Sequence, residues 1–346
     1  MNEPIVIWGA GAIGGTVGAY FQRAGVPVVF VDNVPEHVDA INSNGLSITG
    51  PIEEFNVKAP AFLPQDLPGS HKTIFLCVKA LHTEIACSQI GAKLGDDGCV
   101  VSLQNGLNER VIAEAFGAER TVGAFINFGA DYHGPGEVHF GGYGAVVIGE
   151  LNGVITPRVE ELHQQLLNFE KKAILTPNIM GFLWGKMSYG ALLYATALTN
   201  DAIADVLAST RYHPCLTALA QEVLSVATAE IVTPEKFDGY DPTAFLGTDS
   251  ESINQSFEDM VVHNRKSTKT HSGIWRDLAV RKRLTEVDAQ LGPVVEIGAE
   301  HAIATPITKR LIELIHDIEQ GVRPLAWETL DELVLSMAPE IQQESL

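Results

Sequence analysis

The chain has 346 residues, of which 46% are hydrophobic, and a formal net charge of −20 from 43 acidic and 23 basic side chains. That length predicts two domains rather than one core. The negative charge repels phosphate backbones and so excludes nucleic acid as an expected partner.

The first half of the sequence alternates short apolar runs with helical stretches. The apolar runs, which suit strands buried on both faces, cover residues 4–8, 26–32, 72–80, 98–106 and 121–130. The stretches with helical spacing between them cover residues 12–25, 36–45, 83–95 and 108–117. Strand, helix and strand in this order imply right-handed crossovers, so we predict a doubly wound α/β domain with a parallel sheet.

The pattern changes after residue 135. Glycines break residues 136–153 into strand segments that we interpret as an antiparallel edge, and residues 157–172 predict an amphipathic helix. The later helical stretches cover residues 180–208, 215–231, 281–303 and 307–321. Pro and Gly in the segment TPNIMG mark a boundary, so we expect a dinucleotide-binding domain over residues 1–177 and an all-helical domain over 178–346.

The segment GAGAIG, at residues 9–14, fits the pattern G-x-G-x-x-G between the first strand and the first helix. In this pattern the first glycine allows a tight turn, the second lets a pyrophosphate approach the backbone, and the third lets helix and strand pack closely. The helix that follows presents free N–H groups to phosphates. The candidate cofactor-binding residues here are Gly9, Gly11, Ala12, Ile13 and Gly14.

Asp32 stands at the end of the second apolar run. A carboxylate at this point can accept hydrogen bonds from the ribose hydroxyls of adenosine, and it repels a ribose phosphate. No Arg or Lys follows within VDNVPEH to receive that phosphate. We therefore expect NAD(H) as the preferred cofactor, with NADP(H) still possible. The structural alternative is that Asp32 only caps its loop.

Four further residues carry side chains that could use such a cofactor. Lys79 and Asn105 each follow an apolar run, at strand ends where ligands bind in open α/β sheets. Lys186 lies within an otherwise apolar helical stretch, where an ammonium group is expensive unless it reaches water or a charge. Glu286 lies in a predicted helix beside three basic residues, where it can equally be a solvated acid.

Six short motifs occur in the order GAGAIG, CVKA, QNG, LWGK, TEVD and AIATP. In this order and spacing the chain resembles the ketopantoate reductase (2-dehydropantoate 2-reductase) family over nearly its whole length. The resemblance implies a Rossmann domain joined to a helical domain, with the active site in the cleft between them. It also implies an NAD(P)-dependent dehydrogenase or reductase that acts on a CH–OH group of a small hydroxy or oxo acid.

Carried over position by position, the resemblance gives each candidate a role. Lys186 would be the general acid in reduction and the base in oxidation, and its ammonium would stabilise charge on the substrate oxygen. Glu286 would bind a substrate hydroxyl and help to set the charge of the lysine. Asn105 would position the nicotinamide ribose, and Lys79 would lie near cofactor and substrate. His82 and Asn127 are weaker pocket candidates, each more readily explained as structural.

The chain departs from the family pattern at the substrate. The family carries two asparagines after the lysine, and the same offsets here give Gly190 and Tyr194. Of a serine pair ahead of the glutamate, Ser272 remains and Gly273 replaces the other. A site built on hydrogen bonds discriminates strongly when its partners are missing, so we expect a changed substrate. Tyr194, Ser272 and Arg276 are the candidate substrate residues; Arg276 could hold a carboxylate or be an exposed structural arginine.

Three functions stay open from the sequence. The first is NAD-linked oxidation of a hydroxy acid, the second is NADPH-dependent reduction of 2-dehydropantoate in pantothenate biosynthesis, and the third is a regulator that senses the dinucleotide without turnover. Retention of both Lys186 and Glu286 argues against the third.

The remaining features are consistent with a cytoplasmic enzyme. The four cysteines lack CxxC spacing, the N-terminus lacks a signal-peptide pattern, and no apolar run reaches the roughly 20 residues of a membrane helix. The histidines form no metal-ligand pattern, so we expect no metal site. The apolar C-terminal helices would allow a homodimer, but the sequence leaves the oligomeric state open.

Overall fold

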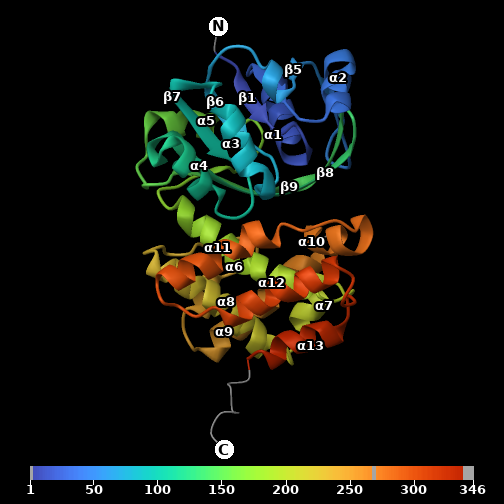
Figure 1. Ribbon diagram of the computed structural model, residues 1–346, viewed down its shortest axis with the longest axis vertical. Coiled ribbons are helices and arrows are strands. Elements are labelled where there is room, and N and C mark those ends of the chain that lie inside the picture. The colour runs from blue at the N-terminus through green and yellow to red at the C-terminus, as the bar shows by residue number, and fades with distance from the viewer. Residues whose placement is uncertain (1–2, 267–269, 338–346) are drawn as a thin grey trace, which may run out of the picture. The chain divides into compact units, whose positions relative to one another are not determined.

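A computed structural model of the chain describes residues 3–266 and 270–337. The chain divides into two compact units, Met1–Ile179 and Met180–Leu346. The first unit contains the strands and the second is helical (Figure 1). The predicted fold class is confirmed: a doubly wound, largely parallel sheet is followed by an all-helical unit. None of the helices described is both long enough and apolar enough to cross a membrane.

The strands of the first unit form one sheet in the order β4-β3-β9-β8-β7-β6-β1-β2-β5, with β10 also paired to β9. The bounds are Ile5–Trp8 (β1), Val28–Val31 (β2), Leu46–Thr49 (β3), Phe55–Val57 (β4), Ala61–Phe62 (β5), His71–Leu76 (β6), Leu94–Ser102 (β7), Thr121–Gly134 (β8), Glu137–Glu150 (β9) and Ile174–Leu175 (β10). Strands β2, β1, β6, β7 and β8 pair in parallel, so their carboxyl ends lie at one edge of the sheet.

Helices cover both faces of this sheet, which is why its central strands are continuously apolar. Ile7 of β1 packs in a core with α1 (Ala12–Arg23), α2 (Pro35–Asn44) and α5 (Pro157–Leu166). Its neighbour Trp8 faces the opposite way, into a core with α3 (Thr83–Ile90) and α4 (Asn108–Phe116). Alternate residues of one strand thus serve two cores, as expected for a parallel sheet buried on both sides.

The predicted antiparallel edge is wrong in its position, although its pairing is antiparallel. Strand β9 pairs antiparallel with β8, as its glycine-broken pattern indicated, but it lies inside the sheet. The first half of β9 pairs with β3 and its second half with β10. These partners are only four and two residues long, so they left no pattern in the sequence from which this pairing could be predicted.

A cluster of polar and aromatic side chains joins the loop before β4 to helix α1. Glu53 accepts hydrogen bonds from the Tyr20 hydroxyl and from Arg23, each at 2.5 Å, and the Arg23 guanidinium lies 4.0 Å from the ring centroid of Phe55. The hydrogen bonds from Arg23 hold the pKa of the Glu53 carboxyl at about 2, below its ordinary 4.5, although burial opposes the shift.

From this cluster we predict that the stability of the folded protein depends on pH. A carboxylate with a lowered pKa stabilises the folded state above the unfolded pKa, and that contribution is lost as pH falls from about 4.5 towards 2. We expect Glu53→Gln to lower the Tm at pH 7 by about 2–4 °C, and to lower it much less at pH 3. Thermal unfolding of Glu54→Gln, which removes the neighbouring exposed carboxylate, is the control. An equal loss at both pH values would contradict the assignment.

The second unit is built from helices that pack on α6 (Ile179–Thr196) and α8 (His213–Ala229). Its other helices are α7 (Ile203–Ala208), α9 (Ser250–Lys266), α10 (Gly273–Trp275), α11 (Val287–Glu300), α12 (Pro306–Glu319) and α13 (Trp327–Leu335), with a π-helical turn over Arg276–Arg281. The single stretch predicted over residues 180–208 is two helices, because the chain turns between Thr196 and Ile203.

The AIATP segment marks the start of α12. Pro306 occupies the first turn, where its missing N–H has no helical partner to lose. The carboxylate of Glu222 on α8 accepts hydrogen bonds from the backbone N–H groups of Ile307 and Thr308, at 2.9 and 2.7 Å. A carboxylate at a helix N-terminus satisfies exposed donors and opposes the helix dipole. This contact joins two helices of the second unit.

Candidate functional site

The glycine turn between β1 and α1 has the three properties that its motif requires. Gly9 has a φ of +97°, and a Cβ placed on it would lie 2.9 Å from the backbone nitrogen of Val78. A Cβ on Gly14 would collide with the Gly9 carbonyl oxygen and lie 2.8 Å from the side chain of Ile7. A Cβ on Gly11, by contrast, would meet no atom within 4 Å. The middle glycine therefore faces open space while the outer two are required by the fold.

This geometry fits a pyrophosphate. Gly11 is the N-cap of α1, no side chain caps the helix there, and its first turn holds no acidic residue. The N–H groups of the first turn, including those of Ala12, Ile13 and Gly14, therefore have no competing anion from their own helix. Backbone donors beside an open Cα position form an anion-binding site of the kind found in dinucleotide-binding domains.

Asp32 follows β2 directly and makes two hydrogen bonds with the backbone around it. One carboxylate oxygen accepts from Ala10 N at 2.9 Å, and the other accepts from Val34 N at 3.1 Å. The side chain thus shapes the glycine turn, as the capping alternative expected. It is still half-exposed, and each oxygen has a second lone pair for a ribose hydroxyl. The two roles of Asp32 are compatible.

His37 is a residue of this region that the sequence did not reveal. Its side chain is 1% exposed, and Nδ1 accepts a hydrogen bond of 2.9 Å from the backbone N–H of Gly136. The proton must then be on Nε2, which donates to the Ala10 carbonyl oxygen at 2.9 Å. A neutral His37 therefore ties the glycine turn to the β8–β9 hairpin. Nothing in its sequence context distinguishes it from a surface histidine of α2.

Two predicted residues lie at the carboxyl edge of the central strands, the edge at which the glycine turn also lies. Lys79 follows β6, just before a 3-10 turn over Ala80–His82, and is half-buried. Asn105 follows β7 and is exposed. His82 is exposed at the start of α3, and Asn127 lies within β8, opposite Ala145 of β9. The first unit thus gathers Asp32, Lys79 and Asn105 at one edge of its sheet.

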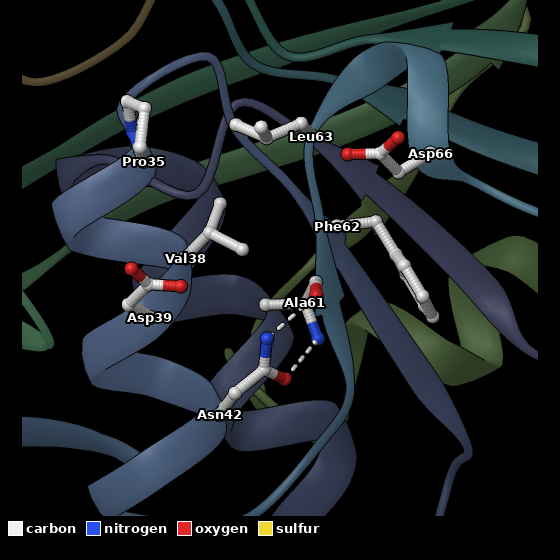
Figure 2. Close-up of a pocket in the computed structure, with 8 residues that line it drawn as sticks. All are labelled: Pro35, Val38, Asp39, Asn42, Ala61, Phe62, Leu63 and Asp66. Atoms are coloured by element: carbon white, nitrogen blue, oxygen red, sulfur yellow. Dashed lines mark hydrogen bonds between the residues drawn. The ribbon is translucent and has the colours of Figure 1, made fainter.

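An open pocket of about 260 Å³ lies beside this edge, between α2 and β5 (Figure 2). Asn42 forms one wall, and its amide is bound to the backbone N–H and C=O of Ala61 at 2.9 Å each. Phe62, on the opposite wall, pairs with Val31, the last residue before Asp32. None of the sequence-predicted residues lines this pocket, and two of its lining side chains are the carboxylates of Asp39 and Asp66.

In the second unit, Lys186 lies on the one less-buried stripe of α6. Phe182, Lys186, Gly190 and Leu193 are half-buried, whereas the positions between them are buried. Their spacing of four, four and three residues places them on one face of the helix. A Cβ placed on Gly190 would meet no atom within 4 Å. The lysine therefore lies on a face with open space one turn away.

Tyr194 lies one turn beyond Gly190 and is completely buried. Burial raises the pKa of its hydroxyl well above 10, and the negative charge of Glu286 raises it further. Glu286 itself is half-buried and occupies the N-cap position of α11, with φ −102° and ψ 27°. The prediction that Glu286 lies within a helix is therefore wrong by one residue, because α11 begins only at Val287. The structure brings Tyr194 and Glu286 close enough to interact.

The segment before Glu286 holds the other candidate substrate residues. Ser272 is buried, and its hydroxyl accepts a hydrogen bond from Trp275 N at 3.1 Å, which caps α10. Arg276 is half-buried at the start of the π-helical turn. The rings of His271 and Trp275 lie 4.1 Å apart, and both residues hydrogen-bond to Asn200. A Cβ on Gly273 would meet no atom within 4 Å, as at Gly190.

Comparison with known families covers both units. Residues 5–153 match the sequence model of ketopantoate reductase PanE/ApbA, and residues 178–319 match that of its C-terminal domain. The chain belongs to the ketopantoate reductase PanE/ApbA family. It is an NAD(P)-dependent oxidoreductase with a nicotinamide cofactor, as the glycine turn and the resemblance predicted.

Individual relatives are distant but cover the chain almost completely. The 2-dehydropantoate 2-reductase of Streptococcus pyogenes serotype M18 is 27% identical over 90% of this chain and 96% of its own. That of Archaeoglobus fulgidus is 26% identical over 92% and 99%.

Solved structures support the fold. D-mandelate dehydrogenase, in a ternary structure with NADH and anilino(oxo)acetate, has a TM-score of 0.79 at 24% identity, over 92% of this chain and 99% of the other. A PanE/ApbA family ketopantoate reductase from Ralstonia eutropha JMP134 has a TM-score of 0.77 at 23% identity, with the same coverage.

Proposed function

We propose that this protein is an NAD(H)-dependent dehydrogenase of a small hydroxy or oxo acid, with Lys186 as its proton-transfer residue. The observation that carries the proposal is the position of Lys186 on the single less-buried stripe of an otherwise buried helix. A lysine on this face can present its ammonium group to a substrate, and Lys186 matches the position of the family's catalytic lysine.

In this mechanism the residues of the chain bind the substrate and move the proton. When bound, a nicotinamide supplies a hydride to the carbonyl carbon of an oxo acid, or accepts one from the carbinol carbon. The Lys186 ammonium donates a proton to the substrate oxygen in reduction, and the neutral amine takes it back in oxidation. Its charge also stabilises the oxygen as negative charge develops. Glu286 binds a substrate hydroxyl and favours the charged form of the lysine.

Asp32 supports a preference for NAD(H). Its half-exposed carboxylate repels a 2′-phosphate, and the chain from Asp32 to His37 supplies no Arg or Lys. We expect the ratio of kcat/KM with NADH to that with NADPH to exceed ten. Asp32→Asn keeps the size and one acceptor oxygen but removes the charge, so it should lower that ratio by about tenfold. Asp96→Asn, which removes an exposed carboxylate at the amino end of β7, should leave it unchanged. Wild-type protein that prefers NADPH would refute this assignment.

The substrate is proposed to differ from that of the 2-dehydropantoate reductases. The two amides that the family carries are replaced by open space at Gly190 and by a buried tyrosine at 194. A substrate whose hydroxyl group needs those amides would lose its hydrogen-bond partners here, so the site should discriminate strongly against that substrate. The D-mandelate dehydrogenase that shares this fold binds NADH and anilino(oxo)acetate, so the fold accommodates an oxo acid with an aromatic group. With NAD, we expect the reaction to run towards oxidation in the cell.

The second candidate is a 2-dehydropantoate 2-reductase that uses NADPH, favoured by the names of the relatives that cover 90% of the chain. Absorbance at 340 nm, measured with either cofactor against ketopantoate, pantoate and a panel of hydroxy and oxo acids, separates the two. Turnover with NAD(H) on another acid supports the first candidate. Efficient reduction of ketopantoate with NADPH would make the protein a biosynthetic enzyme. NAD binding without any turnover would favour a dinucleotide sensor.

A further inference from the structure

The loops that carry Lys79 and Asn105 are joined by a buried hydrogen-bond network. Its members are the side chains of Thr83, Gln104 and Asn108, which are 2, 5 and 5% exposed. They bond to the backbone on either side of Lys79, which is half-buried, and to that of Asn105, which is exposed. We call these three side chains the strand-end network, because they follow β6 and β7, which are neighbours in the sheet.

The bonds of the network run from one loop to the other. Gln104 Nε2 donates to the carbonyl oxygen of Val78 at 3.0 Å and to Thr83 Oγ1 at 2.8 Å. The Thr83 hydroxyl lies 2.7 Å from Asn108 Oδ1 and 2.8 Å from the Ala80 carbonyl oxygen, and its one proton serves one of them at a time. Asn108 Nδ2 donates to the Asn105 carbonyl oxygen at 2.6 Å. The backbone on both sides of Lys79 and at Asn105 itself is therefore held by one connected set of bonds.

We propose that the strand-end network positions Lys79 and Asn105 for the nicotinamide half of the cofactor. The proposal rests on the proposed function and on the positions beside the cofactor that the family resemblance implies for these two residues. The sheet order places β2, with Asp32, on one side of β1 and places β6 and β7 on the other. A dinucleotide whose pyrophosphate lies at Gly11 and whose adenosine lies at Asp32 extends its second nucleotide over β6 and β7.

The network can position the two loops because its three side chains are buried and the hydroxyl of Thr83 links the other two. Without that hydroxyl, Gln104 Nε2 keeps only the Val78 carbonyl, and Asn108 Oδ1 loses its donor. Buried polar groups that lose a partner drive a local rearrangement, since each is costly to leave unpaired. The rearrangement would move the two strand-end loops and leave the glycine turn and Asp32 in place.

The experiment compares Thr83→Val with Thr83→Ser, and measures the Kd of NADH and of ADP. ADP lacks both the nicotinamide and its ribose, so it engages only the glycine turn and Asp32. Thr83→Val should raise the Kd of NADH by about tenfold and change that of ADP less than twofold, while Thr83→Ser should keep the wild-type value for both. KM for NADH should rise with the same variant. Thr83→Ala removes the same hydroxyl with a smaller side chain, so the test does not depend on the folding of one variant.

Thr121→Val is the matched control. Thr121 is fully buried, and its hydroxyl donates to the Gly117 carbonyl oxygen at 2.9 Å, at the amino end of β8. It should change stability without changing either Kd. Equal weakening of both ligands, or an unchanged Kd of NADH in Thr83→Val, would overturn the inference alone. Wild-type protein that binds neither NADH nor NADPH would overturn the proposed function with it. If wild type binds only NADPH, the cofactor preference fails and the same variants tested with NADPH decide the role of the network.

Discussion

Replacement of Lys186 by methionine should lower kcat by about 10²–10⁴-fold and leave the Kd of NADH unchanged. The reason is that general acid–base catalysis contributes about this factor, and the cofactor's phosphates and adenosine are bound elsewhere. Methionine keeps most of the apolar stem that packs along the half-buried stripe of α6, so the helix should not be disturbed. Steady-state rates at 340 nm and NADH fluorescence titration give the two quantities.

Lys309→Met serves as the control for that experiment, because Lys309 is exposed on α12 in the same unit and carries the same charge. It should retain wild-type kcat. If Lys186→Met also retained wild-type kcat, the lysine would not be the proton-transfer residue. If wild type showed no turnover and Lys186→Met preserved the cellular phenotype, the protein would act as a sensor of the dinucleotide.

Addition of one methyl group at Gly11 should abolish tight cofactor binding while the protein stays folded. The Cβ would occupy the open space above the turn, where no protein atom lies within 4 Å, and would hold the pyrophosphate away from the helix N–H groups. We expect Gly11→Ala to raise the Kd of NADH by about two orders of magnitude, with little change in Tm. Calorimetric titration and thermal unfolding measure the two effects separately.

Substitutions at two other glycines provide the comparisons for this prediction. Gly91→Ala adds the same group to an exposed position with helical backbone angles, where its nearest contact is an ordinary 3.8 Å, and should change neither quantity. Gly14→Ala should instead destabilise the protein, because its Cβ would collide with the backbone of Gly9. Wild-type affinity for NADH in Gly11→Ala would show that the cofactor does not pass over this turn.

The sequence predicted the fold where structure is local and missed it where structure depends on distant pairing. The glycine pattern placed the turn, the first helix and Asp32 correctly, because all three lie within 32 residues of the chain. The pairing of β3 with β9 joins residues about 90 positions apart, and β3, with four residues, is too short to leave a periodic pattern. Register over such a separation is set by tertiary packing, which a local pattern does not record.

The same limit applies to the side chains around the proposed site. Lysine in an apolar helix is visible in a sequence because it is anomalous there, and Lys186 indeed lies on the less-buried stripe. His37 looked ordinary and Gln104 was noted only as part of the QNG motif, since the hydrogen bonds of these side chains reach partners 99 and 21 residues away. Glu286 was placed within a helix because its neighbours have helical spacing, but the helix begins one residue later. Long-range hydrogen bonds are what the sequence could not show.

The open space at Gly190 bears on how this protein could have diverged. A side chain can be gained or lost at that position without repacking the helix, and the same holds at Gly273. Mutations there carry little penalty in folding free energy, so selection for stability does not oppose them. On the proposed function, a single substitution at either position could therefore change the substrate without first destabilising the protein.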